Sequence, residues 1–250
     1  MEFMRVEVPY SIDDLASSND LSGVKAITVA FSPKIMLRGQ IDEMISNGED
    51  LNQPVLGKTL LKRAILNDDL EYVANKILPD EKIDTIAYGC TSGTIAIGEN
   101  NVKEKILSAK PSCYVTTPVT SAMKAFKQMD IKKIALFTPY PDAVNKTISD
   151  YFIKKNIEVS SFASLNLNLD SEFAKVDPDY ILKLASRLEF KNADALFISC
   201  TALPVLKILD KLEQKIQKIV LSSNQTLIWD TIRSTGYKSS VKGYGKLLEI

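Results

Sequence analysis

The sequence predicts an α/β protein with two pseudo-symmetric, Rossmann-like α/β halves, parallel sheets, and an active site in the cleft between the halves. Three observations lead to this fold class. Short apolar runs of strand type alternate with helical stretches, which is the pattern of parallel sheets. Two of these runs end in the same residue pair, Cys90-Thr91 and Cys200-Thr201. The length of 250 residues suits one large domain or two small ones.

The expected strands are apolar runs that stop at Pro, Gly or polar residues. Pro9-Tyr10 ends the first run, Pro33 lies just beyond the second, and Pro139-Tyr140 ends the fifth. The run that leads into Gly89-Cys90-Thr91-Ser92-Gly93 is the third. In chain order the predicted strands are 4–8, 25–31, 83–88, 113–117, 133–138, 157–161, 195–198 and 218–221.

The expected helices carry apolar residues at helical spacing or begin with a capping residue. Pro79 stops the longest of them, and Pro141 opens another at its first turn, where a missing N–H costs little. In chain order they are a turn at 11–15, then 59–78, a helix from near Thr94, 101–107, 120–129, 141–155, 178–189, 203–213 and a last helix capped by 222–225 that runs to Arg233. The tail after it is expected to pack loosely.

An internal repeat supports the division into halves. Residues 84–91 (DTIAYGCT) align with 194–201 (DALFISCT). A weaker match pairs Pro9-Tyr10 with Pro139-Tyr140. The two matches differ in offset, which predicts an insertion in the first half, and the polar stretch 34–52 is the place for it. The prediction is therefore a first half of 1–115 plus 225–250 carrying Cys90, and a second half of 116–224 carrying Cys200.

Composition excludes several classes of function. Lys plus Arg and Asp plus Glu are balanced at 31 each, so no basic excess favours binding to nucleic acid or an anionic membrane. No apolar run is long enough to span a bilayer and the start lacks a signal-peptide core, which together favour a cytoplasmic protein. The chain has no histidine, which excludes Ser-His-Asp and Cys-His catalysis and zinc sites that use histidine.

Two of the three cysteines are candidate catalytic groups. An odd and small number of cysteines argues against a disulfide scaffold, so reduced thiols are expected. Cys90 and Cys200 both follow predicted strands, and ligands of parallel α/β folds bind at the carboxyl ends of strands. Cys113 lacks this context and is expected to be a small buried hydrophobe.

The motifs resemble those of the Asp/Glu racemase superfamily, within the group of maleate cis–trans isomerase, arylmalonate decarboxylase and ectoine-utilisation racemase-like proteins. The likeness covers most of the chain from about Gly23 and rests on 87–94 (AYGCTSGT), 137–140 (FTPY), 197–203 (FISCTAL), 222–225 (SSNQ) and Trp229. It implies cofactor-independent, metal-free chemistry on a small carboxylate, and it leaves a homo-oligomer open.

The resemblance also implies roles for individual residues. Cys90 and Cys200 would be the two catalytic thiols. The implied substrate-binding residues are Thr91, Ser92, Tyr140, Thr201 and, from the polar loop, Asn166 or Asn168. Simpler interpretations exist: Thr91 and Ser92 can serve only as helix caps, and Tyr140 can be a packed aromatic.

One departure from the family pattern concerns the substrate. The family usually places a carboxylate-binding Asn after the first strand, whereas residues 9–13 read PYSID. An Asp there would repel a second carboxylate. The function predicted first is a cofactor-independent cis–trans isomerase or racemase acting on a small carboxylate through two cysteines. The alternatives are a metabolite-binding relative without activity and a decarboxylase of the same superfamily.

Overall fold

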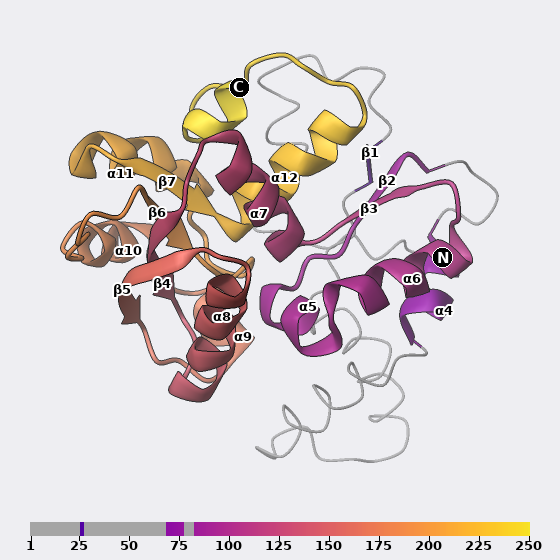
Figure 1. Ribbon diagram of the computed structural model, residues 1–250, viewed down its shortest axis with the longest axis horizontal. Helices are drawn as coiled ribbons and strands as arrows, with labels where there is room; N and C mark the ends of the chain where they lie inside the picture. The colour runs from indigo at the N-terminus through magenta and orange to yellow at the C-terminus, as the bar shows by residue number, and fades with distance from the viewer. Residues whose placement is uncertain (1–25, 28–68, 78–82) are drawn as a thin grey trace.

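The computed structural model describes residues 26–27, 69–77 and 83–250 (Figure 1). The predicted strand 4–8, the turn 11–15 and the insertion 34–52 lie outside these residues, as do most of the strand 25–31 and of the helix 59–78.

Two parallel sheets confirm the predicted α/β class. In the described part, the first sheet has the order β1-β2-β3 and the second the order β5-β4-β6-β7. Their strands are β1 (Ala26–Ile27), β2 (Thr85–Ala87), β3 (Tyr114–Thr116), β4 (Lys133–Thr138), β5 (Glu158–Ser164), β6 (Ala195–Ile198) and β7 (Ile219–Ser222). The strands that lead to the two Cys-Thr pairs are β2 and β6, and each has a neighbouring strand on both sides.

Helices connect the strands, as the alternation predicts. They are α4 (Asp69–Lys76), α5 (Thr91–Ile97), α6 (Glu99–Ala109), α7 (Pro118–Gln128), α8 (Asp142–Lys154), α9 (Asp170–Phe173), α10 (Pro178–Ala185), α11 (Leu209–Ile216) and α12 (Ser223–Ser234), with short 3₁₀ turns η1 (Leu206–Ile208) and η2 (Lys246–Glu249). Figure 1 shows the two sheets side by side, with α7 and α12 running between them.

Each sheet has its own hydrophobic core. In the second half, the ring of Phe126 from α7 meets Phe197 of β6 edge-on at 5.3 Å between ring centroids, and Phe152 of α8 joins them. In the first half, Ile86 of β2 packs with Ile106 of α6 and its buried neighbours. The carboxyl ends of β2 and β6 lie close together, since the residues that follow them are hydrogen-bonded, Thr201 to Gly89.

Helix α12 is the central element of the fold. Every residue from Ser223 to Ile232 is buried, and the helix packs against α7, β2 and β3. Its one buried acid, Asp230, accepts hydrogen bonds from Tyr114 (3.0 Å), Ser121 (3.1 Å) and the Lys124 ammonium (3.0 Å), and also from Thr116. A buried carboxylate needs such partners, so this cluster holds α12 onto β3 and α7.

A second polar contact joins the halves at the surface. Glu99, at the start of α6, accepts a hydrogen bond from the Tyr151 hydroxyl at 2.8 Å and pairs with Lys155, both at the end of α8. Burial raises the pKa of the Glu99 carboxyl, but the hydrogen bonds from Lys155 and Tyr151 and the Lys155 charge outweigh it, so the pKa lies below its ordinary value.

Three local expectations are corrected. The helix after Cys90 begins at Thr91 rather than near Thr94, because Cys90 itself is the N-cap. The helix predicted at 203–213 begins only at Leu209, after the turn η1; Pro204 disfavours helical backbone at the residue before it. A further short helix, α9, which the sequence analysis did not expect, begins at Asp170, directly after the polar loop that carries Asn166 and Asn168.

The C-terminal tail is not loose, as the sequence had suggested. Val241, Leu247 and Leu248 are buried in the hydrophobic core around β4, β6 and β7. The Gly245 N–H donates to the Asp210 carboxylate at 2.6 Å, and Arg233 binds the carbonyl of Leu248 at 3.2 Å. The apolar residues of the tail are spaced too irregularly to predict a helix or strand. The tail is nevertheless fixed to the fold by these polar contacts.

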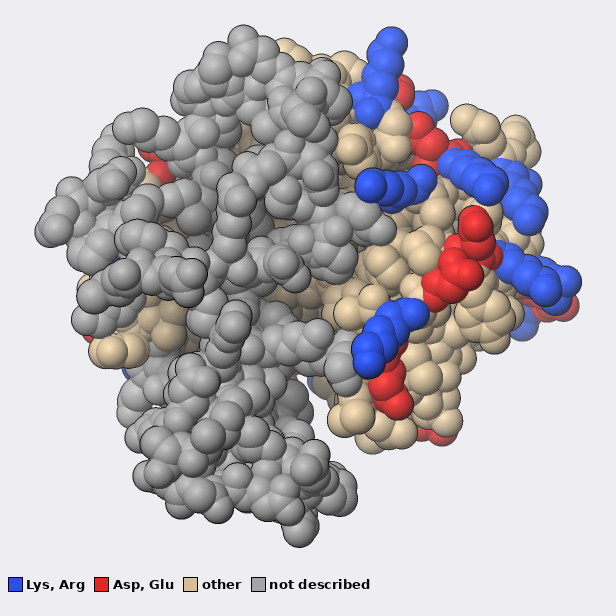
Figure 2. All heavy atoms as spheres, turned by 180° about the vertical axis from the view of Figure 1, so that it is seen from behind, with Lys and Arg blue, Asp and Glu red and all other residues tan. Residues whose placement is uncertain are grey.

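The surface carries both signs of charge. Figure 2 shows Lys and Arg side chains interspersed with Asp and Glu over the coloured part of one face, in keeping with the equal numbers in the sequence. Within the described part of the chain, no helix is both long and apolar enough to cross a bilayer.

Candidate active site

Cys90 sits at the junction of β2 and α5. Its backbone is extended (φ −125°, ψ 115°), and its thiol caps the helix by accepting the Gly93 N–H at 3.3 Å. The carbonyl of Cys90 accepts the Thr94 hydroxyl at 2.6 Å, which fixes the turn from the other side. The residue is 8% exposed, and the Ser92 hydroxyl lies 3.9 Å from the sulfur. The hydrogen bond from the first turn of α5 therefore fixes the direction in which the Cys90 thiol points.

Cys200 occupies a strained turn after β6. Its φ of 118° lies in a region that residues with a side chain rarely adopt, and such strain persists only where the surroundings impose it. The Ala202 N–H points at the sulfur at 3.4 Å, and the residue is 4% exposed. Cys90, Cys113 and Cys200 are not joined by disulfides in the described structure.

The two cysteine turns are hydrogen-bonded to each other. The Thr201 hydroxyl donates to the Gly89 carbonyl at 2.6 Å, which joins the residue after Cys200 to the residue before Cys90. Ser223 provides a second link, since its Oγ lies 3.0 Å from Thr91 Oγ1 and 3.1 Å from the Cys200 backbone nitrogen. Two motifs from different sheets thus form one cluster.

Tyr88 belongs to this cluster although the sequence analysis did not select it. A Cβ added at Gly93 would lie 2.8 Å from Tyr88 Oη and 2.8 Å from Cys90 Sγ, so phenol and thiol face the same small space. Burial, and then the proximity of Cys90, raise the pKa of Tyr88 well above its usual value, so the phenol keeps its proton. The internal repeat held a signal for it: Tyr88 aligns with the apolar Ile198.

The other residues predicted to bind substrate are Tyr140, Asn166 and Asn168. Tyr140 is buried at the end of β4 with its ring edge-on to Phe173 at 5.5 Å. Asn166 and Asn168 are exposed. The Asn166 N–H donates to Ser164 Oγ at 3.0 Å, and the Asn168 N–H donates to the Glu172 carboxylate at 3.0 Å. Neither asparagine side chain enters the buried cluster in this structure.

Cys113, just before β3, is a small buried residue in the same hydrophobic cluster as Ile86 and Cys90. Burial raises the pKa of its thiol, which disfavours the reactive thiolate. Among the described residues, no group of three or more Cys, Asp and Glu side chains is arranged to hold a metal ion.

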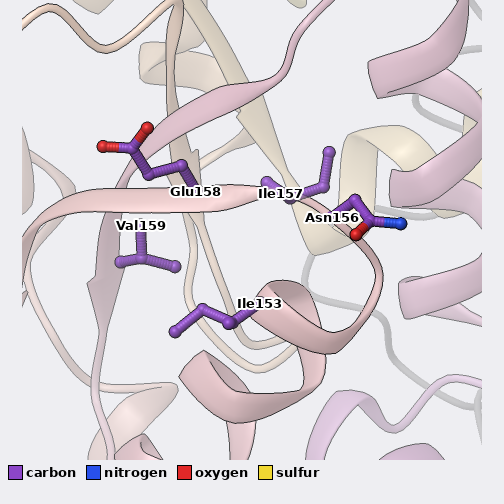
Figure 3. A pocket seen from close by; sticks show the side chains of 5 residues that line it. All are labelled: Ile153, Asn156, Ile157, Glu158 and Val159. Atoms are coloured by element: carbon purple, nitrogen blue, oxygen red, sulfur yellow. The ribbon is translucent and has the colours of Figure 1, made fainter.

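A surface depression at the turn from α8 into β5 is separate from the cysteines. Figure 3 shows its lining side chains: Ile153 and Val159 lie on one side of the strand while Glu158 points to the other. Ile157 and Asn156 complete it. None of the residues predicted for the site lines this depression, so it does not mark the chemistry.

The fold and the paired cysteine turns define the class of protein. Two parallel α/β units, each with a Cys-Thr turn at a strand end, are the arrangement expected for the Asp/Glu racemase superfamily. A family model described as arylmalonate decarboxylase matches residues 83–248, which is most of the chain. The chain therefore belongs to the arylmalonate decarboxylase family.

Individual relatives agree with this assignment. The chain is 27% identical over 187 residues to a maleate isomerase of Alcaligenes faecalis, covering 68% of this chain and 71% of the relative. A crystal structure of the maleate isomerase Iso from Pseudomonas putida S16 is similar in fold, with a TM-score of 0.70, 20% identity and coverage of 77% and 79%. A mutant maleate cis–trans isomerase of Nocardia farcinica, with a covalently bound succinylcysteine intermediate, has a TM-score of 0.66, 20% identity and coverage of 72% and 76%.

Proposed function

We propose that this protein is a cofactor-independent cis–trans isomerase of a small unsaturated carboxylate, with Cys90 and Cys200 as its two catalytic thiols. The observation that carries the proposal is the direct hydrogen bonding between the two cysteine turns, through Thr201 to Gly89 and through Ser223. Two thiols carried by hydrogen-bonded turns of two different sheets, in a chain without histidine, form a pair suited to nucleophilic and proton-transfer chemistry.

The relatives indicate the substrate class. Maleate isomerases are the relatives matched over about two thirds of this chain, and one related structure holds a succinylcysteine. A succinyl thioether is what results when a thiol adds across the double bond of maleate. Maleate, or an unsaturated carboxylate of similar size, is therefore the substrate that we propose.

The reaction needs one nucleophile and one proton carrier. The Cys90 thiolate attacks one alkene carbon and forms a C–S bond, while the π electrons move toward the carboxylate on the other carbon. The Cys200 thiol gives its proton to that second carbon. Rotation about the new single bond follows; the Cys200 thiolate takes the proton back, the C–S bond breaks, and the trans alkene leaves. No electrons are gained or lost overall.

Donors for the substrate carboxylate come from the start of α5. The Thr91 hydroxyl is already committed to Ser223, so its contribution is the backbone N–H, whereas Ser92 offers both an N–H and a hydroxyl near Cys90. Tyr140 would add a phenol. Thr201 uses its hydroxyl on Gly89 and so shapes the site. Asn166 or Asn168 would have to move inward to bind substrate.

The test is an isomerisation assay with maleate, following the formation of fumarate by NMR. Cys90→Ser and Cys200→Ser are each expected to abolish turnover, because either change removes one half of the thiol pair. Cys113→Ser is the matched control; it changes a buried thiol in the core and is expected to keep turnover. Full activity in both active-site variants would end the two-thiol proposal.

A second candidate is decarboxylation, which the family model favours. Release of CO₂ from an arylmalonate by the wild-type protein, without isomerisation of maleate, would support it. Retention of this release in Cys90→Ser would assign the reaction to Cys200 alone. Binding of a carboxylate without any turnover would instead support the metabolite-binding alternative.

Several sequence-based predictions remain proposals beside this function. They are the division into 1–115 plus 225–250 and 116–224, a cytoplasmic location, and assembly into a homo-oligomer. The departure at residues 9–13 lies outside the described residues. Because an Asp there would repel a second carboxylate, the assay should include unsaturated monocarboxylates as well as maleate. Turnover of monocarboxylates, but not of maleate, would agree with such a repulsion by Asp13.

A further inference from the structure

The Ser223 hydroxyl hydrogen-bonds to both cysteine turns. Ser223 is the first residue of α12 and is completely buried. Its oxygen accepts the Thr91 hydroxyl from the first half and the Cys200 N–H from the second. A hydroxyl oxygen has two lone pairs for accepting, so both are in use.

The bond to Cys200 acts where the backbone is strained. A φ of 118° is unfavourable for a cysteine, so the turn would relax if the groups that hold it were removed. Ser223 holds it at the Cys200 N–H, and the neighbouring Asn224 donates from Nδ2 to the Thr201 carbonyl at 2.8 Å. Because the backbone of Cys200 sets the direction of its thiol, these bonds also determine where the sulfur points.

The bond to Thr91 acts on the other thiol. Thr91 is the first residue of α5, directly after Cys90, and is almost fully buried. Cys90 is the N-cap of α5, and its sulfur accepts the Gly93 N–H. A shift of Thr91 would therefore also shift the Cys90 sulfur. The Ser223 oxygen is thus the hydrogen-bond acceptor that the two turns share.

We propose that Ser223 is a positioning residue that sets the separation of the Cys90 and Cys200 thiols by binding both turns through one oxygen. The catalytic meaning of that separation depends on the proposed function, but the coupling of the two turns does not. Ser223 itself need not touch substrate. Its neighbour Ser222 has a different task, since Ser222 Oγ accepts the Gln225 N–H at 3.1 Å as the N-cap of α12.

The adjacent serines provide a matched pair of variants. Both are completely buried, both stand at the start of α12, and Ser→Ala removes one hydroxyl from each. The readout is the alkylation rate of each cysteine by iodoacetamide, resolved by mass spectrometry, together with kcat and KM. Alkylation needs no substrate, so failure of the proposed function and failure of this inference give different results.

In Ser223→Ala, Cys200 is expected to react at least about threefold faster as its turn relaxes, and kcat to fall about 10- to 100-fold with KM nearly unchanged, the penalty of a misplaced reacting group. Ser223→Thr, which keeps the oxygen, should restore both values. Ser222→Ala should lose stability but keep the wild-type alkylation rate and kcat. Equal effects in the two alanine variants, or a wild-type Cys200 rate in Ser223→Ala, would overturn the inference.

A variant on the opposite turn keeps the test decisive if Ser223→Ala does not fold. Thr91→Val keeps the shape of the side chain and removes the hydroxyl that Ser223 accepts. It should change Cys200 alkylation by at least about twofold, the lower end of coupling within one hydrogen-bond network. An unchanged Cys200 rate in Thr91→Val would contradict the bridge.

Discussion

Replacing Gly93 by alanine would place one methyl group between two buried side chains. The new Cβ would lie 2.8 Å from Cys90 Sγ, 2.8 Å from Tyr88 Oη and 3.3 Å from Cys90 Cβ. Carbon atoms optimally stand about 3.5–4.0 Å from such neighbours, so at least one side chain has to move. Both neighbours are buried at the junction of β2 and α5, where space for that movement is small.

Two opposing terms set the size of the effect. Overpacking a buried site costs about 1–3 kcal/mol, whereas alanine in place of glycine within a helix contributes about 1 kcal/mol in its favour. The net loss of stability for Gly93→Ala is therefore about 0–2 kcal/mol. The loss of function should be larger, because a displaced Cys90 sulfur lowers turnover by about 10- to 100-fold.

Urea unfolding and the isomerisation assay measure the two effects. Gly236→Ala is the comparison, because Gly236 has open space around it and a φ of 88°; that change should cost stability through the backbone and leave turnover intact. Tyr88→Phe removes Oη, one of the two atoms that the new methyl group would meet. The double variant Tyr88→Phe/Gly93→Ala should therefore lose less stability than the sum of the losses in the two single variants. Additive losses, together with wild-type turnover in Gly93→Ala, would refute the steric reasoning.

Two further predictions concern contacts distant from the thiols. Because the pKa of Glu99 in the fold lies below its unfolded value of about 4.3, this carboxylate stabilises the protein above that pH, and the stabilisation is lost as the pH falls through the folded value. Glu99→Gln should therefore lower stability at neutral pH, by less than about 1 kcal/mol for a partly exposed pair, and match wild type in acid; a pH-independent difference in urea midpoints would contradict this. Leu247→Ala should lower the free energy of unfolding by about 2–5 kcal/mol, since Leu247 is fully buried. Ile250 is half-exposed, so Ile250→Ala should lower it far less. Equal losses of stability on thermal unfolding would show that the tail does not support the core.

The sequence was a good guide to elements whose signal is local. The strands at 133–138 and 195–198 have the predicted bounds, since each is a continuous apolar run between polar residues. The repeat of the Cys-Thr pair also located the two turns. These patterns depend on neighbours in the chain, which a sequence displays directly.

Features that depend on distant residues were harder to predict. Ser223 looked like a helix cap, because its role depends on Thr91 and Cys200, both far from it in the chain. The positive φ of Cys200 has no residue signature, since glycine would be the expected choice there. Tyr88 stood inside an apolar run, and its repeat partner is the apolar Ile198. Each of these properties arises from tertiary contacts.

Helix α12 has a consequence for the order in which the molecule can form during synthesis. It covers β2 and β3 of the first half, and the residues after it, among them Leu247 and Leu248, fill the core around β4 to β7. The core around β4 to β7 is therefore not complete before residues 241–248 have been made. Although domains generally fold in order of synthesis, the core around β4 to β7 is thus expected to close only after α12 and the residues beyond it have been made, and Ser223 can link the two cysteine turns only then.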